Sequence, residues 1–341
     1  MAGVPSLTTT FPVRRGERQL VSPARPTPYE FKMLSDIDDQ DVLRFYRSGA
    51  FFYRSNASAM AGLDPVEVIR SALSEALVHF YPLAGRFREL RPTRKLVVEC
   101  TGEGVVFVEA DADVRMDDLG DFLAPPVPCY DKWLCEPESP TADVVDRPLL
   151  YVQVTRLKCG GFIFAFQICH CMADGIGTVQ FLTALTEFVR GVPGAPTLCR
   201  RPFRYALQLL LEAKARASRE GYVQSVAGFN AARRRPPFPK ARTYLISDVT
   251  QAGMLAVDFG WGRPVYGGPA TIMLASFHQE GRNEAGEPGI VVPIRLPAPA
   301  MERLKRNVRK GLGAHVDVET KTTADETNSN MHGGAPVLAK L

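Results

Sequence analysis

The sequence lacks a long hydrophobic run and a strong excess of either charge. Its longest apolar stretch, Phe162 to Cys169, is far shorter than the roughly 18 residues that a membrane-spanning helix needs, so we expect no membrane segment. The chain has 41 Lys and Arg residues against 37 Asp and Glu residues, and the two signs are interspersed. This balance gives no support for nucleic-acid binding and leaves small molecules as the expected partners.

A disulfide framework and a secretory leader are also missing. The seven cysteines are an odd number without regular spacing. The first 19 residues include Arg14, Arg15 and Arg18 but no apolar core of the kind that a signal peptide has. We therefore expect a cytoplasmic protein with reduced thiols, and the sequence implies no metal.

The length and composition are those of a globular protein with about two domains. The chain has 341 residues, of which 45% are hydrophobic and 23% charged. A loop-like run at Pro193 to Pro202 separates two predicted units, 1–198 and 203–312. Residues 313–341 contain few large apolar side chains, so we expect them to form a disordered tail.

The first unit shows strong helix and strand signals. Asp64 and Pro65 are typical of a helix start, and an apolar stripe with spacings of three and four residues follows until Phe80. Strands are expected at 95–99 and 105–108. The alternating segment 150–157, Gly160-Gly161 and the apolar segment 162–169 predict a hairpin whose second strand is buried on both faces.

The second unit has weaker signals. It predicts helices and strands in the following segments: a helix at 205–218, strands at 242–247 and 289–296, and a helix at 298–310. Taken together with the first unit, these elements predict an α/β protein with mixed sheets and flanking helices.

The run His170-Cys171-Met172-Ala173-Asp174-Gly175 follows directly after the predicted buried strand, and a helical stripe from Ile176 to Val189 follows the run. Such strand-to-helix junctions present side chains to clefts. A neutral imidazole at His170 is able to take a proton from a hydroxyl or an amine that attacks a carbonyl group. Asp174 is able to hold the turn through a backbone amide or an arginine without touching substrate. A purely structural histidine is the competing interpretation.

Cys169 and Cys171 flank this histidine and raise the alternatives of a thiol nucleophile or a metal site. Neighbouring residues on an extended strand point to opposite faces, so these three side chains do not converge on one ion. We interpret both cysteines as small buried hydrophobic residues.

The run Asp258-Phe259-Gly260-Trp261-Gly262 contains the triplet that binds metal in protein kinases, but the other kinase motifs are absent. The run is rich in turn residues around one of only two tryptophans. Its local interpretation is a rigid structural loop.

Four segments of the chain together carry a resemblance to a known family. They are the HCMADG run with its following Gly-x-Gly, the DFGWG run, the segment Tyr81 to Arg86, and the opening stretch Val21 to Tyr53. In the order in which they occur along the chain, they resemble those of the BAHD family of plant acyl-CoA-dependent acyltransferases. Within it the chain is most similar to the alcohol acyltransferase branch, with its benzyl alcohol benzoyltransferases and taxane acetyltransferases.

The resemblance implies two chloramphenicol-acetyltransferase-like α/β domains with a channel between them. It implies that His170 is the catalytic base, that Asp174 and Gly175 hold the loop by a salt bridge of the aspartate, and that Asp258, Phe259, Gly260, Trp261 and Gly262 are mainly structural. Acyl-CoA is then a co-substrate, with no permanently bound cofactor, and the full-length protein is expected to be a monomer of plant secondary metabolism.

The spacing of the two motifs departs from the family. Fewer than a hundred positions separate His170 from Asp258, whereas family members have well over a hundred residues more. The absent block corresponds to the interdomain crossover and the first half of the second domain, with a join near Cys199 to Arg204. CoA contacts normally come from there, so no CoA-binding residue is assigned. The basic run Arg233 to Arg235 would suit CoA phosphates, although a solvated surface is the favoured interpretation.

Two hypotheses of function follow. In the first, the chain is an active acyltransferase that moves an acyl group from a CoA thioester to an alcohol. In the second, the loss of half a domain leaves an inactive relative that at most binds a ligand or a partner protein. Retention of the motifs favours the first hypothesis, and the short length favours the second.

Overall fold

The structure is a computed structural model of the 341-residue chain. It describes residues 11–191 except 56–59, 61, 121–122, 136 and 138–142; residues 225, 228, 229 and 232; residues 245–312 except 272–274, 283–286 and 295; and residues 337–340. The predicted helix 205–218, the join near 199–204 and the basic run 233–235 lie outside the described residues.

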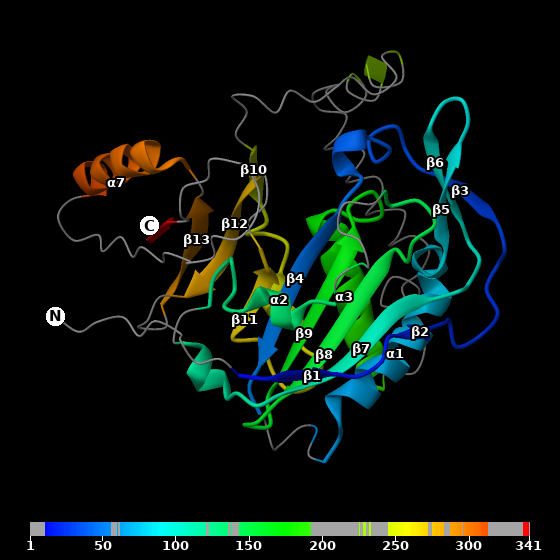
Figure 1. The fold of residues 1–341 in the computed structure, drawn as a ribbon, viewed down its shortest axis with the longest axis horizontal. Helices are drawn as coiled ribbons and strands as arrows, with labels where there is room; N and C mark the ends of the chain where they lie inside the picture. Colours follow the sequence, from blue (N-terminus) through cyan, green and yellow to red (C-terminus); the bar gives the residue numbers. More distant parts are fainter. Residues whose placement is uncertain are drawn as a thin grey trace, which may run out of the picture.

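A large mixed sheet forms the centre of the molecule (Figure 1). Its strands, in spatial order, are β1 (Val13–Arg15), β7 (Val105–Ala112), β8 (Leu150–Leu157), β9 (Phe162–Cys169), β4 (Tyr46–Tyr53) and β11 (Tyr266–Pro269), and β2 (Gln19–Val21) also pairs with β7. β7 and β8 are parallel, whereas β8, β9 and β4 are antiparallel neighbours.

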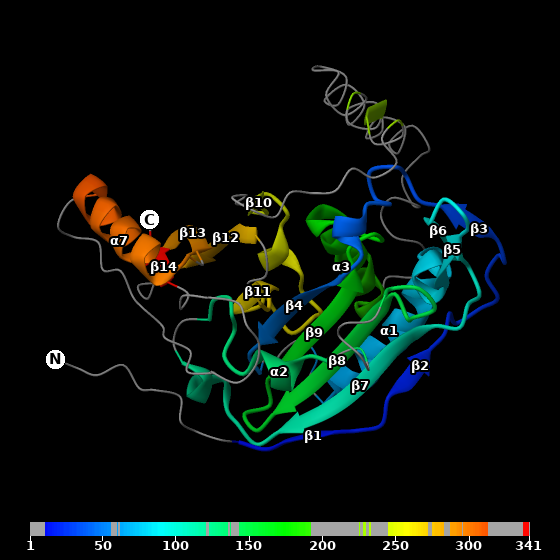
Figure 2. The same ribbon diagram turned by 45° about the horizontal axis from the view of Figure 1, so that its top comes forward.

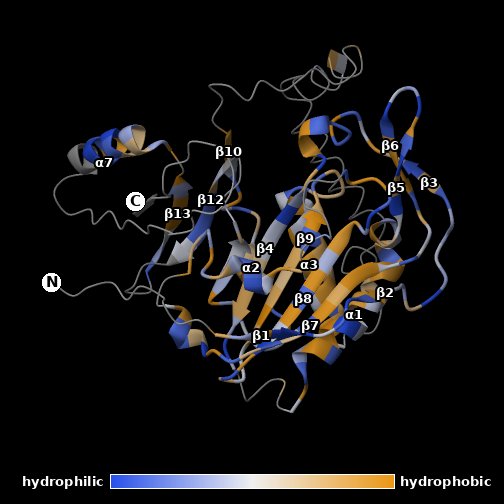
Figure 3. Ribbon diagram, in the orientation of Figure 1, coloured by the Kyte–Doolittle hydropathy of each residue, from blue (hydrophilic) through white to orange (hydrophobic). Residues whose placement is uncertain are grey.

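The predicted hairpin is confirmed with the predicted bounds of both strands. Gly160, in the turn, has a positive φ of 80°, which glycine tolerates without steric cost. All eight residues of β9 are buried, because helices cover one face of the sheet and loops with a short helix cover the other. Figure 3 shows the apolar residues concentrated on these central strands.

Two helices, α1 (Pro65–His79) and α3 (Gly175–Val189), pack on one face of the central sheet (Figure 2). The predicted start of α1 is confirmed, since the Asp64 side chain accepts a hydrogen bond from the amide of Val66. The predicted stripe of α3 holds except at Ile176, whose side chain is 60% exposed. Ile176 lies in the first turn of α3, beyond the end of β9, so the strand does not cover its side chain.

Two smaller sheets flank the central one. One contains β3 (Phe31–Met33), β6 (Lys95–Glu99) and β5 (Arg86–Leu90), and the other contains β10 (Leu245–Asp248), β12 (Ala275–Arg282), β13 (Pro288–Ile294) and β14 (Val337–Lys340). The predicted strand 105–108 is the first half of the longer β7. The predicted strands 242–247 and 289–296 correspond to β10 and β13 with shifted bounds.

The remaining helices are short, apart from the last. They are η1 (Asp41–Leu43), η2 (Tyr81–Ala84), η3 (Met116–Leu119), α2 (Tyr130–Trp133), η4 (Met254–Ala256) and α7 (Ala298–Leu312). α7 agrees with the helix predicted at 298–310, and it lies beside the second small sheet (Figure 1). No helix in the described ranges is long and apolar enough to cross a membrane.

The two predicted units are interleaved in space. Val249, Met254, Val257, Phe259 and Trp261 belong to the same hydrophobic core as α1 and α3, and β11 extends the central sheet beyond β4. Residues 249–269 of the predicted unit 203–312 therefore complete the core of the unit 1–198. Within the segment 313–341, the described residues Val337–Lys340 pair with β13.

Candidate active site

His170 stands at the turn between β9 and α3. Its backbone amide donates a hydrogen bond to the carbonyl of Phe45 at 2.8 Å, which continues the pairing of β4 with β9 by one residue. The ring centroids of the two residues are 5.2 Å apart. The turn is closed by the amide of Met172, which donates to the carbonyl of Cys169 at 2.9 Å. The backbone that carries the imidazole is therefore held by hydrogen bonds to Phe45 and Cys169.

The two ring nitrogens of His170 have different surroundings. Nε2 lies 3.5 Å from Nη1 of Arg47. Nδ1 is buried, and no other described residue hydrogen-bonds to it. Burial lowers the pKa of His170, and the charge of Arg47 lowers it further. A lowered pKa favours the neutral imidazole, which is the state that a general base requires.

Asp174 holds the turn through backbone amides. It is the N-cap residue of α3, and its Oδ1 accepts a hydrogen bond from the amide of Gly177 at 2.7 Å. Its side chain is exposed and forms no ion pair with a described residue. Of the two ways of bracing the turn that the sequence suggested, the described residues show the backbone amide. Gly175 leaves room for Val249, because a Cβ at Gly175 would lie only 3.1 Å from that side chain.

The cysteines on either side of His170 are packed into the protein. Cys169 and Cys171 are both buried in a cluster with Phe87 and Val98. The contact with Cys169, together with burial, raises the pKa of the Cys171 thiol. A raised pKa disfavours the thiolate that nucleophilic catalysis needs. The described residues contain no group of three or more His, Cys, Asp or Glu able to hold a metal ion.

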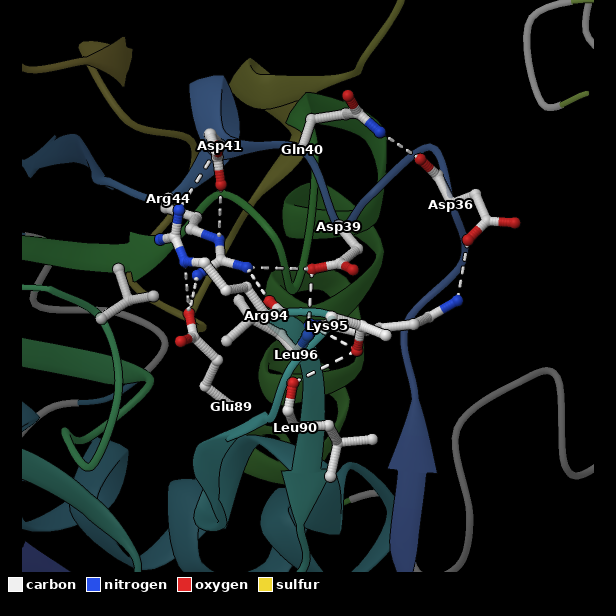
Figure 4. A network of polar contacts seen from close by, with 12 residues as sticks. Asp36, Asp39, Gln40, Asp41, Arg44, Glu89, Leu90, Arg94, Lys95 and Leu96 are labelled. Atoms are coloured by element: carbon white, nitrogen blue, oxygen red, sulfur yellow. Dashed lines mark hydrogen bonds and ion pairs between the residues drawn. The ribbon is translucent and has the colours of Figure 1, made fainter. Parts of the chain in front are cut away.

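A buried polar network anchors the segment that leads into β4 (Figure 4). Arg44 pairs with Glu89 at 2.8 Å and with Asp39 at 3.4 Å, and it donates to the carbonyl of Arg94. Asp39 is only 3% exposed and also accepts a hydrogen bond from the amide of Leu96. The network joins η1 to the β5–β6 hairpin and fixes the residue next to Phe45, so it supports His170 from a distance. Sequence reasoning missed it because its members are distant in the chain.

The loop Asp258–Gly262 is held by its own aspartate. Oδ1 of Asp258 accepts hydrogen bonds from the amides of Gly260 at 2.8 Å and Gly262 at 2.9 Å. Gly260 and Gly262 have φ angles of 92° and 93°, a region that favours glycine. Phe259 packs between Tyr53 and Phe164, and Trp261 packs edge-on against Phe162. This geometry is that of a rigid loop.

The structure does not bring the two motifs together. Trp261 contacts Phe162, the first residue of β9, whereas His170 follows the last. A strand of this length spans roughly 25 Å, so the loop is remote from the imidazole. The residue that does meet His170 is Arg47, which sequence reasoning missed. The available signal was a charged residue, Arg47, shortly before the apolar part of β4.

Comparison with solved structures identifies the fold. The structure of vinorine synthase matches with a TM-score of 0.59 and 17% sequence identity over 81% of this chain and 93% of that chain. Vinorine synthase has the chloramphenicol-acetyltransferase-like α/β fold of the BAHD acyltransferases, so this chain has that fold. The predicted fold class is confirmed.

The family follows from sequence. The model of the Transferase family, which is the BAHD family, matches residues 11–207 and 195–310. Benzyl alcohol O-benzoyltransferase of Petunia hybrida is 36% identical over 448 residues, which cover 92% of this chain and 96% of the relative. Alcohol acyltransferase 1 of Actinidia chinensis var. chinensis is 34% identical over 92% of this chain and 96% of the relative. The chain belongs to the BAHD family of acyl-CoA-dependent acyltransferases.

The same comparisons locate the absent block. The family model matches in two separate segments that meet at 195–207. The alignment with the Petunia relative is 448 positions long, more than a hundred longer than this 341-residue chain. The chain therefore lacks an internal block that its relatives contain, at the place where the join was predicted.

Proposed function

We propose that this chain transfers an acyl group from a coenzyme A thioester to the hydroxyl of an alcohol, with His170 as the general base. The observation that carries the proposal is the placement of His170: its backbone amide is bound to the Phe45 carbonyl at the end of β9, its side chain is only partly buried, and burial lowers the pKa of its imidazole. The relatives support the acceptor class, since one is a benzyl alcohol O-benzoyltransferase and another a (Z)-3-hexen-1-ol acetyltransferase of Arabidopsis thaliana.

The reaction needs one base and no covalent enzyme intermediate. Nε2 of His170 takes the proton of the acceptor hydroxyl, and the oxygen attacks the thioester carbonyl carbon. The tetrahedral intermediate then collapses and expels the CoA thiolate, which takes the proton back from the imidazolium. An ester and free CoA result. Because the thioester is already activated, placing both substrates beside one imidazole supplies much of the rate.

The other motif residues act on the shape of the site. Asp174 caps α3 and so sets the direction in which the turn presents His170. Gly175 allows Val249 to approach that turn. Asp258, Phe259, Gly260, Trp261 and Gly262 hold the far end of the core and have no contact with the reacting atoms in this proposal.

An inactive, ligand-binding relative is the second candidate, and the absent block is the observation that favours it. In BAHD enzymes part of the substrate channel comes from that block. A chain without it would keep His170 in place and could bind acyl-CoA, yet would fail to align the thioester with the acceptor for turnover. The two candidates differ in turnover and not in the geometry of the turn.

We also propose a cytoplasmic location and a monomeric state for the full-length protein, with small molecules as its only substrates. Six cysteines in the described ranges are free thiols, as expected in a reducing compartment. The division into an N-terminal acyltransferase domain 1–198, a remnant of the C-terminal acyltransferase domain 203–312 and a disordered tail 313–341 remains a proposal.

A panel assay tests the proposal. The purified 341-residue chain is incubated with acetyl-, benzoyl- and hydroxycinnamoyl-CoA, each with benzyl alcohol and with a short aliphatic alcohol, and both ester and free CoA are quantified. We expect equal amounts of ester and CoA from at least one pair. No ester from any pair, combined with saturable binding of acyl-CoA by calorimetry, would establish the inactive relative instead.

A further inference from the structure

Strand alternation places Arg47 and His170 side by side. β4 pairs antiparallel with β9 so that Arg47 lies opposite Ile168, two residues before His170. Side chains two apart on a strand share a face, so His170 continues the face that Ile168 begins. Arg47 and His170 are therefore diagonal neighbours on the face that α3 covers. The distance of 3.5 Å between Nη1 of Arg47 and Nε2 of His170 agrees with this placement.

The guanidinium of Arg47 is enclosed but lacks a counter-ion among the described residues. It lies over the ring of Phe277, 5.4 Å from the centroid, and a Cβ at Gly175 would lie 4.0 Å from its Nη1. No described carboxylate forms an ion pair with it; Asp174 acts on it only through a longer-range attraction. Burying an arginine without an anion is unfavourable. A negative charge that enters the space beside Arg47 is therefore strongly stabilised by the guanidinium.

A hydrogen bond at this contact is compatible with only one tautomer of the neutral imidazole. A guanidinium has only donors, so Nε2 can meet Arg47 only as an acceptor. The ring proton is then on Nδ1, and the lone pair of Nε2 faces the space in front of Arg47. A hydroxyl that approaches Nε2 therefore comes within reach of the guanidinium.

We propose that Arg47 is a catalytic residue that donates hydrogen bonds to the oxyanion of the tetrahedral intermediate. The inference rests on the proposed function. When the acceptor oxygen bonds to the thioester carbon, the carbonyl electron pair moves to the carbonyl oxygen, while the hydroxyl proton goes to Nε2 of His170. The new oxyanion is separated from the acceptor oxygen by a single carbon atom, so it forms next to Arg47. Collapse re-forms the carbonyl and releases the thiolate, which takes the proton from His170.

The charges around His170 are consistent with this role. Burial and Arg47 lower the pKa of the imidazole, whereas Asp174 and Asp38 act in the opposite direction. The positive charge of Arg47 disfavours the imidazolium form of His170, and the same charge stabilises the negative oxygen of the tetrahedral intermediate. A substrate carboxylate would be recognised by the same guanidinium, and the experiment must separate that possibility from the oxyanion.

The test compares Arg47→Gln and Arg47→Lys with Arg54→Gln as the matched control. Arg54 follows the same strand, has a side chain 60% exposed and pairs with Asp117 at the surface, so its loss removes the same charge away from the site. With a neutral acyl-CoA and a neutral alcohol, Arg47→Gln should lower kcat about 100-fold with little change in KM. Arg47→Lys should recover part of that loss, and Arg54→Gln should retain the parental kcat.

A histidine titration by NMR, with His170 assigned by His170→Ala, completes the test. Arg47→Gln should move the His170 titration to higher pH, and Arg47→Lys should move it less. An unchanged titration in Arg47→Gln would overturn the contact. Suppose that Arg47→Gln leaves kcat on neutral substrates unchanged and raises KM only for substrates that carry a carboxylate. Arg47 would then recognise the substrate carboxylate, and its proposed role at the oxyanion would be wrong. A parent chain without turnover refutes the proposed function and this catalytic role together, while a titration shift in Arg47→Gln still confirms the contact.

Discussion

Arg190 and Asp258 connect the two motifs of the chain. The guanidinium of Arg190, at the C-terminal end of α3, binds Oδ2 of Asp258 at 3.2 Å and the Asp258 carbonyl at 2.9 Å. α3 runs back along the length of β9, so the helix that begins after His170 ends on the loop 258–262. The loop therefore stabilises the scaffold that carries the histidine without approaching it.

This relationship predicts that Asp258→Ala destabilises the protein. The substitution removes the acceptor of two loop amides as well as the partner of Arg190. We expect a loss of about 1–3 kcal/mol in the free energy of unfolding, measured by urea denaturation. Asp113→Ala, which removes a surface ion pair with Lys158, is the control and should leave the free energy of unfolding nearly unchanged. Equal effects of the two substitutions would contradict a bracing role for the loop.

The buried network at Asp39 predicts a larger effect. Asp39→Ala leaves Arg44 without one of its buried partners and the Leu96 amide without its acceptor. We expect the free energy of unfolding to fall by about 3 kcal/mol, because removing one partner of a buried ion pair leaves the charge of the other partner buried without compensation. Asp41→Ala, at a half-exposed partner of the same arginine, should cost far less. Thermal unfolding by circular dichroism measures both, and a smaller effect at Asp39 than at Asp41 would refute the account.

The N-cap role of Asp174 predicts different outcomes for two substitutions. Asp174→Asn keeps an oxygen that can accept from the Gly177 amide, so it should change stability by only a few tenths of a kcal/mol. Asp174→Ala removes the acceptor and should cost about 1 kcal/mol. The free energy of unfolding of both variants decides the matter. If Asp174→Asn is as damaging as Asp174→Ala, the charge of Asp174 matters more than the cap.

The absent block predicts association of the chain. Ile246 on β10 and Ile290 on β13 are 60% and 49% exposed on the same small sheet, and the block that the relatives have in addition is absent. We expect the 341-residue chain to form oligomers or aggregates in size-exclusion chromatography. The double substitution Ile246→Thr and Ile290→Thr should shift it toward the monomer. Ile176→Thr, at a residue that is equally exposed on α3, should not; a purely monomeric parent chain would contradict the prediction.

The central hairpin and both large helices could be predicted from the sequence, because their signals are local. β9 is a continuous apolar run after a double glycine, and α1 has a capping aspartate followed by proline. Ile176 was misassigned because periodicity does not show where the underlying sheet ends. The bounds of β7, β10 and β13 shifted because pairing with a neighbour sets the length of a strand.

The site itself was only partly predictable. His170 and Asp174 stand in one short run, so their proximity follows from the sequence. Arg47 reaches His170 through the register of β4 against β9, which no local pattern contains. The same is true of β11, which joins the central sheet from far along the chain.

The most direct test of the account is the turnover of His170→Ala on the acyl-CoA and alcohol pair that the parent chain uses best. The control is His79→Ala, which alters an exposed histidine on α1. We predict that His170→Ala lowers kcat at least about 100-fold while the protein remains folded, and that His79→Ala retains the parental rate. The parental kcat/KM should fall only as the pH drops below the ordinary histidine range, because the lowered pKa of His170 keeps the imidazole neutral down to a lower pH. Near-parental turnover by folded His170→Ala would contradict the account.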